Sequence, residues 1–177
     1  MISQVFEGAP AEQREPVEQR VYDCLQQLDI PFARVDHDAI FTMEGCEAIS
    51  EKLGVITCKN LLLAPRNKST FYLYCTEPDK LFSSKDFSKA VGSSRLSFAG
   101  EDDLMTLLGV TPGSASVLGL INDAEHRVTL ALDRSVAEAE YFGCHPCRNT
   151  STLRLKTADV LHKFLPFIGV EPIIIDG

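Results

Sequence analysis

The sequence lacks the features of disordered, fibrous and membrane-spanning chains. It has only 11 Gly and 9 Pro in 177 residues, and its mean hydropathy is near zero, which excludes a disordered or collagen-like chain. No apolar run reaches the roughly 18 residues of a transmembrane helix. The first twenty residues have neither a basic start nor an apolar stretch, so we expect no signal peptide and a cytosolic protein without a membrane partner.

The common motifs of cofactor and nucleophile chemistry are also missing. There is no GxxxxGK[ST] loop, no GxGxxG fingerprint, no GxSxG elbow and no HExxH pair. Six cysteines are too few for a disulfide framework, so reduced thiols are expected. Cys144-His145-Pro146-Cys147 is a CxxC without the second pair that a structural zinc site uses. We therefore expect no metal and no cofactor, and keep thiol redox chemistry at Cys144 and Cys147 as an alternative.

The charge is unevenly distributed along the chain. The net charge is −8, whereas nucleic-acid-binding domains are usually basic. Residues 50–95, however, carry 8 basic and 4 acidic side chains, while the segments on either side are acidic. The middle segment is therefore a candidate anion-attracting surface on an acidic body, with a solvated surface of scattered lysines as the alternative. The basic side chains of this candidate surface include Lys52, Arg66, Lys68, Lys85 and Lys89.

Helical and extended patterns mix without strict βαβ order. Apolar residues recur at helical spacing after Pro16, and Thr42 and Gly54 are suited to begin and end a second helix. Further helices are predicted at 84–91, 101–108 and 157–165, and strands at 30–35, 60–64, 70–76, 96–98, 127–132, 150–155 and 173–175. We predict an α+β fold, in which a flexible arm of residues 1–15 precedes a single domain of residues 16–177 with a mixed, mostly antiparallel sheet flanked by helices.

Three polar features are candidates for chemistry. Lys59 precedes the apolar run Asn60-Leu61-Leu62-Leu63, where an ammonium group could face a phosphate or carbonyl oxygen, although a lysine at a sheet edge often only protects that edge. The loop Gly113-Ser114-Ala115-Ser116 could expose backbone N–H groups toward an anion, or be an ordinary surface loop followed by a buried strand. His145 either orients a ligand or is a satisfied polar residue.

Five segments follow one another along the chain: Phe41-Thr42-Met43-Glu44, Cys58-Lys59-Asn60-Leu61-Leu62-Leu63, Leu108-Gly109-Val110-Thr111-Pro112-Gly113-Ser114, Gly119-Leu120-Ile121-Asn122-Asp123 and His145-Pro146-Cys147-Arg148-Asn149-Thr150. In this order they resemble the YbaK/prolyl-tRNA editing domain family. The resemblance covers residues 16–176 and is greatest to the freestanding ProX-type branch. It implies a compact mixed sheet flanked by helices, with a pocket beside the strand that Lys59 begins.

The resemblance also implies a function and a set of site residues. The implied activity is that of a trans-editing hydrolase, an aminoacyl-tRNA deacylase that removes a wrong amino acid from the acceptor end of tRNA(Pro), alanine in the ProX-type branch. The implied catalytic residues are Lys59, Asn60 and His145. The implied substrate-binding residues are Thr42, Gly113, Ser114, Ala115, Ser116, Gly119, Asn122, Asp123 and Asn149. Val117 stands where the family's substrate loop has proline, which leaves this loop less rigid and the preferred amino acid open.

An aminoacyl ester is already activated, so its hydrolysis needs no catalytic triad. We hypothesise that Lys59 and loop N–H groups stabilise the developing oxyanion while water attacks, aided by the vicinal hydroxyl of the terminal adenosine. Lowering the barrier by about 4–6 kcal/mol would accelerate the reaction about 10³–10⁴-fold. A small apolar pocket, for which Ile40 and Leu118 are candidates, would admit alanine and exclude proline.

Several alternatives remain open from the sequence. The substrate could be tRNA charged with cysteine, serine or threonine, or the protein could bind tRNA ends without catalysis. A prolyl-tRNA synthetase or another translation factor could supply most of the tRNA affinity. The third class is a thiol redox accessory protein that uses Cys144 and Cys147.

Overall fold

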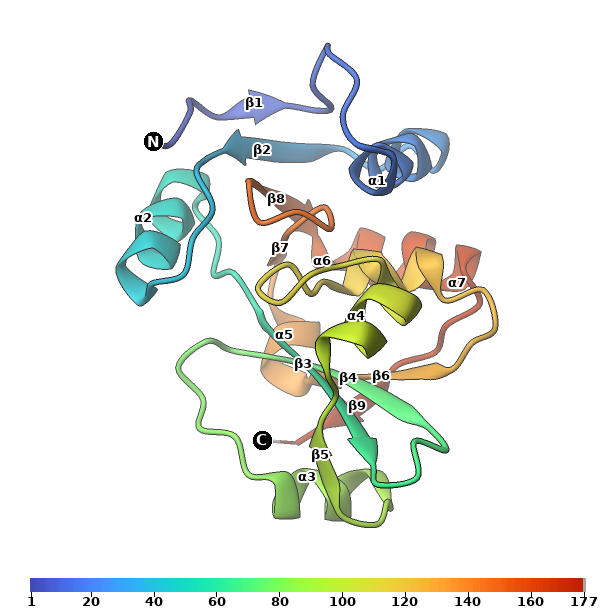
Figure 1. The fold of residues 1–177 in the computed structure, drawn as a ribbon. Helices are drawn as coiled ribbons and strands as arrows, with labels where there is room; N and C mark the ends of the chain where they lie inside the picture. Colours follow the sequence, from blue (N-terminus) through green and yellow to red (C-terminus); the bar gives the residue numbers. More distant parts are fainter. Residues whose placement is uncertain (177) are drawn as a thin grey trace.

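The computed structural model, which describes residues 1–176, contains two β-sheets linked by helices (Figure 1). The upper sheet is antiparallel throughout, in the strand order β1 (Phe6–Glu7), β2 (Phe32–Asp36), β8 (Ser151–Lys156) and β7 (Tyr141–Cys144). The lower sheet has the order β5 (Leu96–Phe98), β3 (Lys59–Pro65), β4 (Phe71–Thr76), β6 (Val128–Asp133) and β9 (Ile173–Ile175). Strands β4, β6 and β9 run parallel, and β3 is antiparallel to both its neighbours. The predicted α+β class is confirmed, but its sheet is divided in two.

Helices connect and cover the sheets. They are α1 (Pro16–Gln27), α2 (Met43–Leu53), α3 (Ser84–Val91), α4 (Glu101–Leu108), the 3₁₀-helix η1 (Val117–Asn122), α5 (Arg134–Glu138) and the continuous helical segment formed by α6 (Thr157–Asp159), the π-helical η2 (Val160–Phe164) and α7 (Leu165–Phe167). The apolar segment after the Gly113 loop is thus a 3₁₀-helix rather than a strand. Within residues 1–176, none of these helices combines the length and the apolar character needed to cross a membrane.

The sequence signals at the ends of α2 act as predicted. The Thr42 hydroxyl oxygen accepts a hydrogen bond from the Gly45 backbone N–H at 3.1 Å, which satisfies one of the free donors at a helix N-terminus. Gly54 ends the helix with a φ of 69°, a left-handed conformation that glycine adopts without the steric cost of a Cβ atom. These two signals fix the ends of a helix that forms one wall of the cleft described below.

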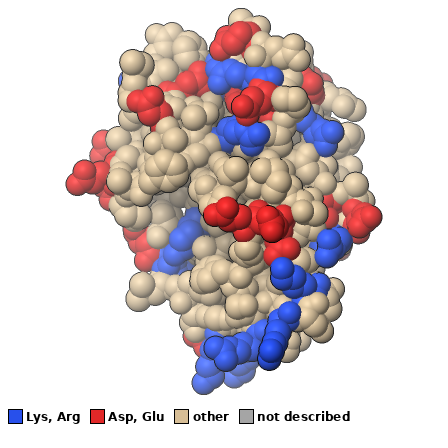
Figure 2. Space-filling view, in the orientation of Figure 1, with Lys and Arg blue, Asp and Glu red and all other residues tan. Residues whose placement is uncertain are grey.

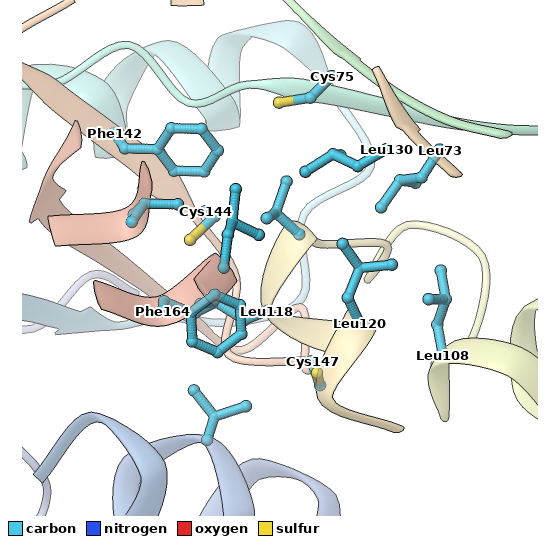
Figure 3. Packing of buried hydrophobic residues seen from close by; sticks show 14 of the residues in the cluster. Leu73, Cys75, Leu108, Leu118, Leu120, Leu130, Phe142, Cys144, Cys147 and Phe164 are labelled. Carbon is cyan, nitrogen blue, oxygen red and sulfur yellow. The ribbon is translucent and has the colours of Figure 1, made fainter. Parts of the chain in front are cut away.

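The main hydrophobic core lies between the two sheets. It combines Leu73 and Leu130 of the lower sheet with Phe142 of the upper sheet, and Leu118 of η1 and Phe164 of η2 fill the space between them (Figure 3). All five side chains are at most 1% exposed. Smaller clusters attach α3 to the outer face of the lower sheet and α2 to the upper sheet. The core therefore holds the two sheets in a fixed relation on either side of the cleft.

Within the segment expected to form a flexible arm, residues 1–8 lie along β2. Phe6 pairs with Arg34, and Ile2 forms an isolated bridge with His37. The guanidinium group of Arg34 also stacks 4.7 Å from the centre of the Phe6 ring. This segment consequently adds an edge strand to the upper sheet.

Candidate active site

A cleft of about 540 Å³ lies where β3 begins. This volume is within the range of about 300–1,000 Å³ that is usual for small-molecule sites. Its lining comes from α2, the start of β3, the loop before η1 and the turn after β7. The predicted site residues that line it are Lys59, Asn60, Gly113, Ala115, His145 and Asn149.

Lys59 is held at the first position of β3 by its backbone and by its side chain. Its backbone pairs with Thr76 of β4, and its Nζ donates a hydrogen bond to the Lys80 carbonyl oxygen at 2.6 Å. It makes no ion pair with any carboxylate in the part of the chain that the structure describes. Because an ammonium group has three N–H donors, this single contact leaves two for a ligand.

The segment that holds Lys59 is itself anchored to a buried carboxylate. Asp133, at the end of β6, is 2% exposed. It accepts a hydrogen bond from Lys80 Nζ at 2.9 Å, and further hydrogen bonds from the hydroxyl groups of Tyr74 and Thr76. Asp133 therefore fixes the position of Lys80, and the carbonyl oxygen of Lys80 in turn orients the ammonium group of Lys59.

His145 presents a neutral imidazole ring. Its Nδ1 lies 2.8 Å from the Ser151 carbonyl oxygen, which can only accept, so Nδ1 carries the hydrogen and Nε2 is an acceptor. Burial lowers the pKa of His145 from its ordinary value, against the effect of this hydrogen bond, and the nearby His37 lowers it further. Nε2 has no hydrogen-bond partner among the described residues. The cleft lining thus includes a positioned acceptor, Nε2 of His145, and a cation, Lys59.

His37 supports His145 and was not identified from the sequence. The two rings are 6.1 Å apart between centroids, and both contact Thr152, whose hydroxyl lies 2.8 Å from His37 Nε2 and 3.3 Å from His145 Nδ1. The only sequence signal was the Asp36-His37-Asp38 triplet at the end of a predicted strand. Because β2 and β8 are far apart in sequence, this contact depends on sheet pairing.

The loop before η1 approaches the cleft through backbone and small side chains. Gly113 has a φ of +89°, and a Cβ atom there would lie 3.5 Å from Asn149 Nδ2 and 3.8 Å from the Phe41 ring. Asn149, in the turn after β7, donates its Nδ2–H to the Ile40 carbonyl oxygen at 2.7 Å, which ties this turn to the segment that precedes α2. The side-chain oxygens of Asn60 and Asn149 are buried without a partner among residues 1–176, so two acceptors in the wall remain unsatisfied.

Three predicted binding residues of the Gly113 loop and η1 lie outside the cleft lining. The backbone N–H of Ser114 donates to the Thr111 carbonyl oxygen at 3.0 Å, so it is not one of the anion-facing N–H groups expected from the loop. Ser116 is fully buried and its hydroxyl oxygen accepts from the Leu118 N–H at 3.1 Å, which begins η1. Gly119 packs against Leu108, where a Cβ atom would be only 3.2 Å from the Leu108 backbone. Their positions serve local folding.

The remaining predicted binding residues have partners elsewhere. Thr42 is exposed and caps α2. Asn122 donates to the Leu108 carbonyl oxygen at 2.9 Å and accepts from Arg20. Asp123 accepts from the backbone N–H groups of Arg127 and Val128. The structure therefore does not bring these three side chains to the cleft lining.

Three carboxylates in the cleft lining were not identified from the sequence. Glu47 and Glu51 come from successive turns of α2, and Asp79 comes from the segment between β4 and α3. Lys59 is the cation on the same lining. A ligand that carries its own ammonium group would complement this arrangement. The sequence signal for Glu47 and Glu51 is their i, i+4 spacing, which also occurs on solvated helix faces.

The thiols of the CxxC segment lie in the core rather than at the surface. Cys144 and Cys147 are at most 1% exposed and are surrounded by leucine and phenylalanine side chains (Figure 3). Burial raises the pKa of Cys144 well above its ordinary value and that of Cys147 to about 12. Because the thiolate is the reactive form, these conditions disfavour redox chemistry at this pair.

Known proteins resemble this chain in sequence or in fold. A family model described as "Aminoacyl-tRNA editing domain" matches residues 37–163, a range that contains all residues of the cleft lining. The chain is 30% identical to the prolyl-tRNA editing protein ProX of Acetoanaerobium sticklandii, over 80% of this chain and 87% of that protein. It is 31% identical to prolyl-tRNA synthetase associated domain-containing protein 1 of Danio rerio, over 94% of this chain and 89% of that protein. A solved structure proposed to be a trans-editing enzyme for prolyl tRNA synthetase superposes with a TM-score of 0.68 at 14% identity, covering 93% of this chain and 98% of that one.

Proposed function

This chain belongs to the aminoacyl-tRNA editing domain family, and from that premise we propose that it hydrolyses the ester between tRNA(Pro) and a wrongly attached amino acid, preferably alanine. The relatives named for prolyl-tRNA editing and for prolyl-tRNA synthetase support the choice of this tRNA. We expect the protein to act in the cytoplasm, where charged tRNA is used. The partner in this proposal is the acceptor end of the tRNA.

The observation that carries the proposal is the directed ammonium group of Lys59. Its two remaining N–H donors would bind the ester carbonyl oxygen or the phosphate of the terminal adenosine. Water adds to the carbonyl carbon, the ester C–O bond breaks, and the proton passes to the departing ribose oxygen. Charge develops on the carbonyl oxygen during this addition, and a cation fixed beforehand stabilises that charge without reorganisation.

His145 and the substrate supply the remaining polar contacts in this scheme. Nε2 of His145 accepts a hydrogen bond from the attacking water, which its neutral state allows. The vicinal ribose hydroxyl of the adenosine assists the transfer of the proton. The carboxylates of Glu47, Glu51 and Asp79 are available for the α-ammonium group of the amino acid.

Selectivity would come from the apolar and small residues of the lining. Ile40 and Ala115 line the cleft, whereas Leu118, the other candidate from the sequence, is fully buried in the core. A missing or extra methylene in an apolar pocket changes binding by only about 1–3 kcal/mol. Tighter binding of alanine alone could therefore not separate it well from proline. Steric exclusion of the larger proline ring by the lining residues would separate the two better.

The test is a panel of tRNA(Pro) charged with alanine, serine, cysteine, threonine or proline, incubated with purified protein in single-turnover assays. We expect alanyl-tRNA(Pro) to be deacylated fastest and prolyl-tRNA(Pro) to remain intact. If the cysteinyl, seryl or threonyl ester were hydrolysed faster than the alanyl ester, that amino acid would be the preferred substrate in place of alanine. Binding of all five without hydrolysis would instead favour a non-catalytic module, and equal hydrolysis of the alanyl and prolyl esters would rule out size exclusion.

A further inference from the structure

A group of basic side chains lies at the end of the lower sheet that is remote from the cleft. We propose that this surface, defined by Arg66, Lys68, Lys85, Lys89 and Arg95 and here called the basic patch, binds the phosphodiester backbone of duplex RNA adjoining the 3′ end in the cleft. The inference rests on the proposed function, since it assumes that the ligand in the cleft is the end of an RNA chain.

The fold gathers these five residues from three separate elements. Arg66 and Lys68 lie in the β3–β4 turn, Lys85 and Lys89 are one helical turn apart on α3, and Arg95 immediately precedes β5. Arg95 borders two depressions, one shared with Arg66 and Lys68 and the other with Lys85 and Lys89. Figure 2 shows blue side chains gathered at the lower end of the molecule, where Figure 1 places α3, β5 and the β3–β4 turn.

Most of the positive charge in the basic patch is available to a ligand. All five side chains are exposed. Lys68 pairs with Asp103 at 2.9 Å, whereas the other four make no ion pair within residues 1–176. Asp86 on α3 is the acidic residue between Lys85 and Lys89 in sequence. A local excess of cations on a protein of net charge −8 gives a polyanion one favourable direction of approach.

The chemistry of the depressions fits phosphate oxygens. Hydroxyl side chains lie between the cations, with Ser94 and Ser97 bordering one depression and Ser93 bordering the other. Lysine, arginine and serine are the usual donors to the phosphates of nucleic acids. Phe98, which is 64% exposed, borders the first depression and adds a ring that could contact a sugar or base.

Strand β3 sets the distance between the basic patch and the cleft. Lys59 begins this strand in the cleft, and Arg66 follows its last residue. Seven residues of extended chain span about 20 Å. The basic patch therefore cannot contact the esterified nucleotide itself, and its ligands would be phosphates farther along the same RNA. The duplex next to the single-stranded 3′ end is the part of a tRNA that such a spacing would reach.

The experiment compares two variants with the same change of charge. The patch variant carries Lys85→Gln, Lys89→Gln and Arg95→Gln, and the control variant carries Arg134→Gln, Lys156→Gln and Lys163→Gln, all exposed residues outside the basic patch. Binding of an uncharged acceptor-stem minihelix is measured from 50 to 300 mM salt, together with deacylation of the charged minihelix and of an aminoacyl ester of adenosine alone. Thermal melts of both variants are recorded alongside.

We expect the patch variant to bind the minihelix about 10- to 100-fold more weakly than the wild-type protein, with the slope of log K against log salt reduced by about 2 to 3. Its KM for the charged minihelix should rise while its kcat and its activity on the adenosine ester stay unchanged, and the control variant should resemble the wild type. Equal salt slopes for the two variants would overturn the proposal even if deacylation is normal. Binding of both variants to vesicles that contain anionic phospholipid is measured in parallel. If the patch variant loses vesicle binding but keeps RNA binding, the proposal is also overturned, since the surface would then serve a membrane.

The uncharged minihelix separates this proposal from the proposed function. A salt-dependent loss of RNA binding in the patch variant supports the basic patch even if no mischarged RNA is hydrolysed, and that result would count against the proposed deacylation alone.

Discussion

The variant Lys80→Met tests how the ammonium group of Lys59 is held. Methionine keeps most of the length and the apolar stem of lysine but cannot pair with Asp133. The Lys80 side chain is 34% exposed and lies 2.9 Å from Asp133 Oδ2, whose side chain is 3% exposed. A hydrogen bond to a charged group contributes about 1.5–3 kcal/mol. Because Asp133 keeps two hydroxyl donors and Lys80 is partly solvated, we expect a free energy of unfolding lower by about 1.5 kcal/mol.

The catalytic effect follows from the backbone of the same residue. Without its side-chain anchor, the segment after β4 no longer fixes the carbonyl oxygen that accepts the Lys59 hydrogen bond. If Lys59 then loses about 1–2 kcal/mol of transition-state stabilisation, the single-turnover rate falls about 5- to 30-fold. The KM should change little, because Lys80 itself does not line the cleft.

The assay is single-turnover deacylation of alanyl-tRNA(Pro), measured with urea denaturation of the same samples. Lys80→Arg is the matched variant, since arginine can pair with Asp133 and should recover most of the rate and stability. If Lys80→Met loses stability as expected but deacylates at the wild-type rate, the carbonyl oxygen of Lys80 does not position Lys59.

Three other variants or conditions test the remaining structure. Burial lowers the pKa of His145 from 6.5, so activity should stay level from pH 8 to 6.5 and fall only below that. As the pH falls, His145 is protonated in the unfolded state before it is protonated in the folded state, so the free energy of unfolding should also decline below about pH 6.5. Activity that already falls above pH 7 would contradict the assignment of His145 as the neutral acceptor. Thr42→Ala should lower the free energy of unfolding by about 1 kcal/mol through loss of the α2 cap, with KM unchanged, and Thr42→Ser should restore it. A tenfold rise in KM at unchanged stability would instead place Thr42 in substrate binding. Leu118→Ala should lower the free energy of unfolding by about 2–5 kcal/mol, since the side chain is fully buried, and Leu118→Met should lower it less. If Leu118→Ala lowered it by less than about 1 kcal/mol, Leu118 would not pack in the core as described.

Local sequence signals predicted most elements because their causes are local. The cap at Thr42 and the left-handed Gly54 fix α2 through contacts within a few residues. The apolar run that follows Lys59 likewise predicts strand β3 from local sequence alone. The resemblance to a family then selected Lys59, Asn60 and His145, which the fold does bring to one cleft.

Long-range packing explains what the sequence did not predict. Strand β7 was not predicted because Tyr141–Cys144 is short and includes Gly143, whose backbone approaches Ile56 so closely that a Cβ atom would be 2.9 Å from its carbonyl oxygen. The division into two sheets depends on which strands pair, and one strand's hydrophobic pattern does not specify its partner. The contact between Lys80 and Asp133 joins residues 53 positions apart, so the support of Lys59 becomes visible only in the folded protein.

The most direct test of the central claim is the single-turnover rate of Lys59→Ala with alanyl-tRNA(Pro), measured beside Lys156→Ala, a control at an exposed lysine outside the cleft. Removing one preorganised donor to a developing oxyanion typically costs about 10²–10³ in rate. We therefore expect a loss of at least about 100-fold for Lys59→Ala and none for Lys156→Ala. A Lys59→Ala protein that deacylates at the wild-type rate would show that the ammonium group at the start of β3 does not carry the reaction.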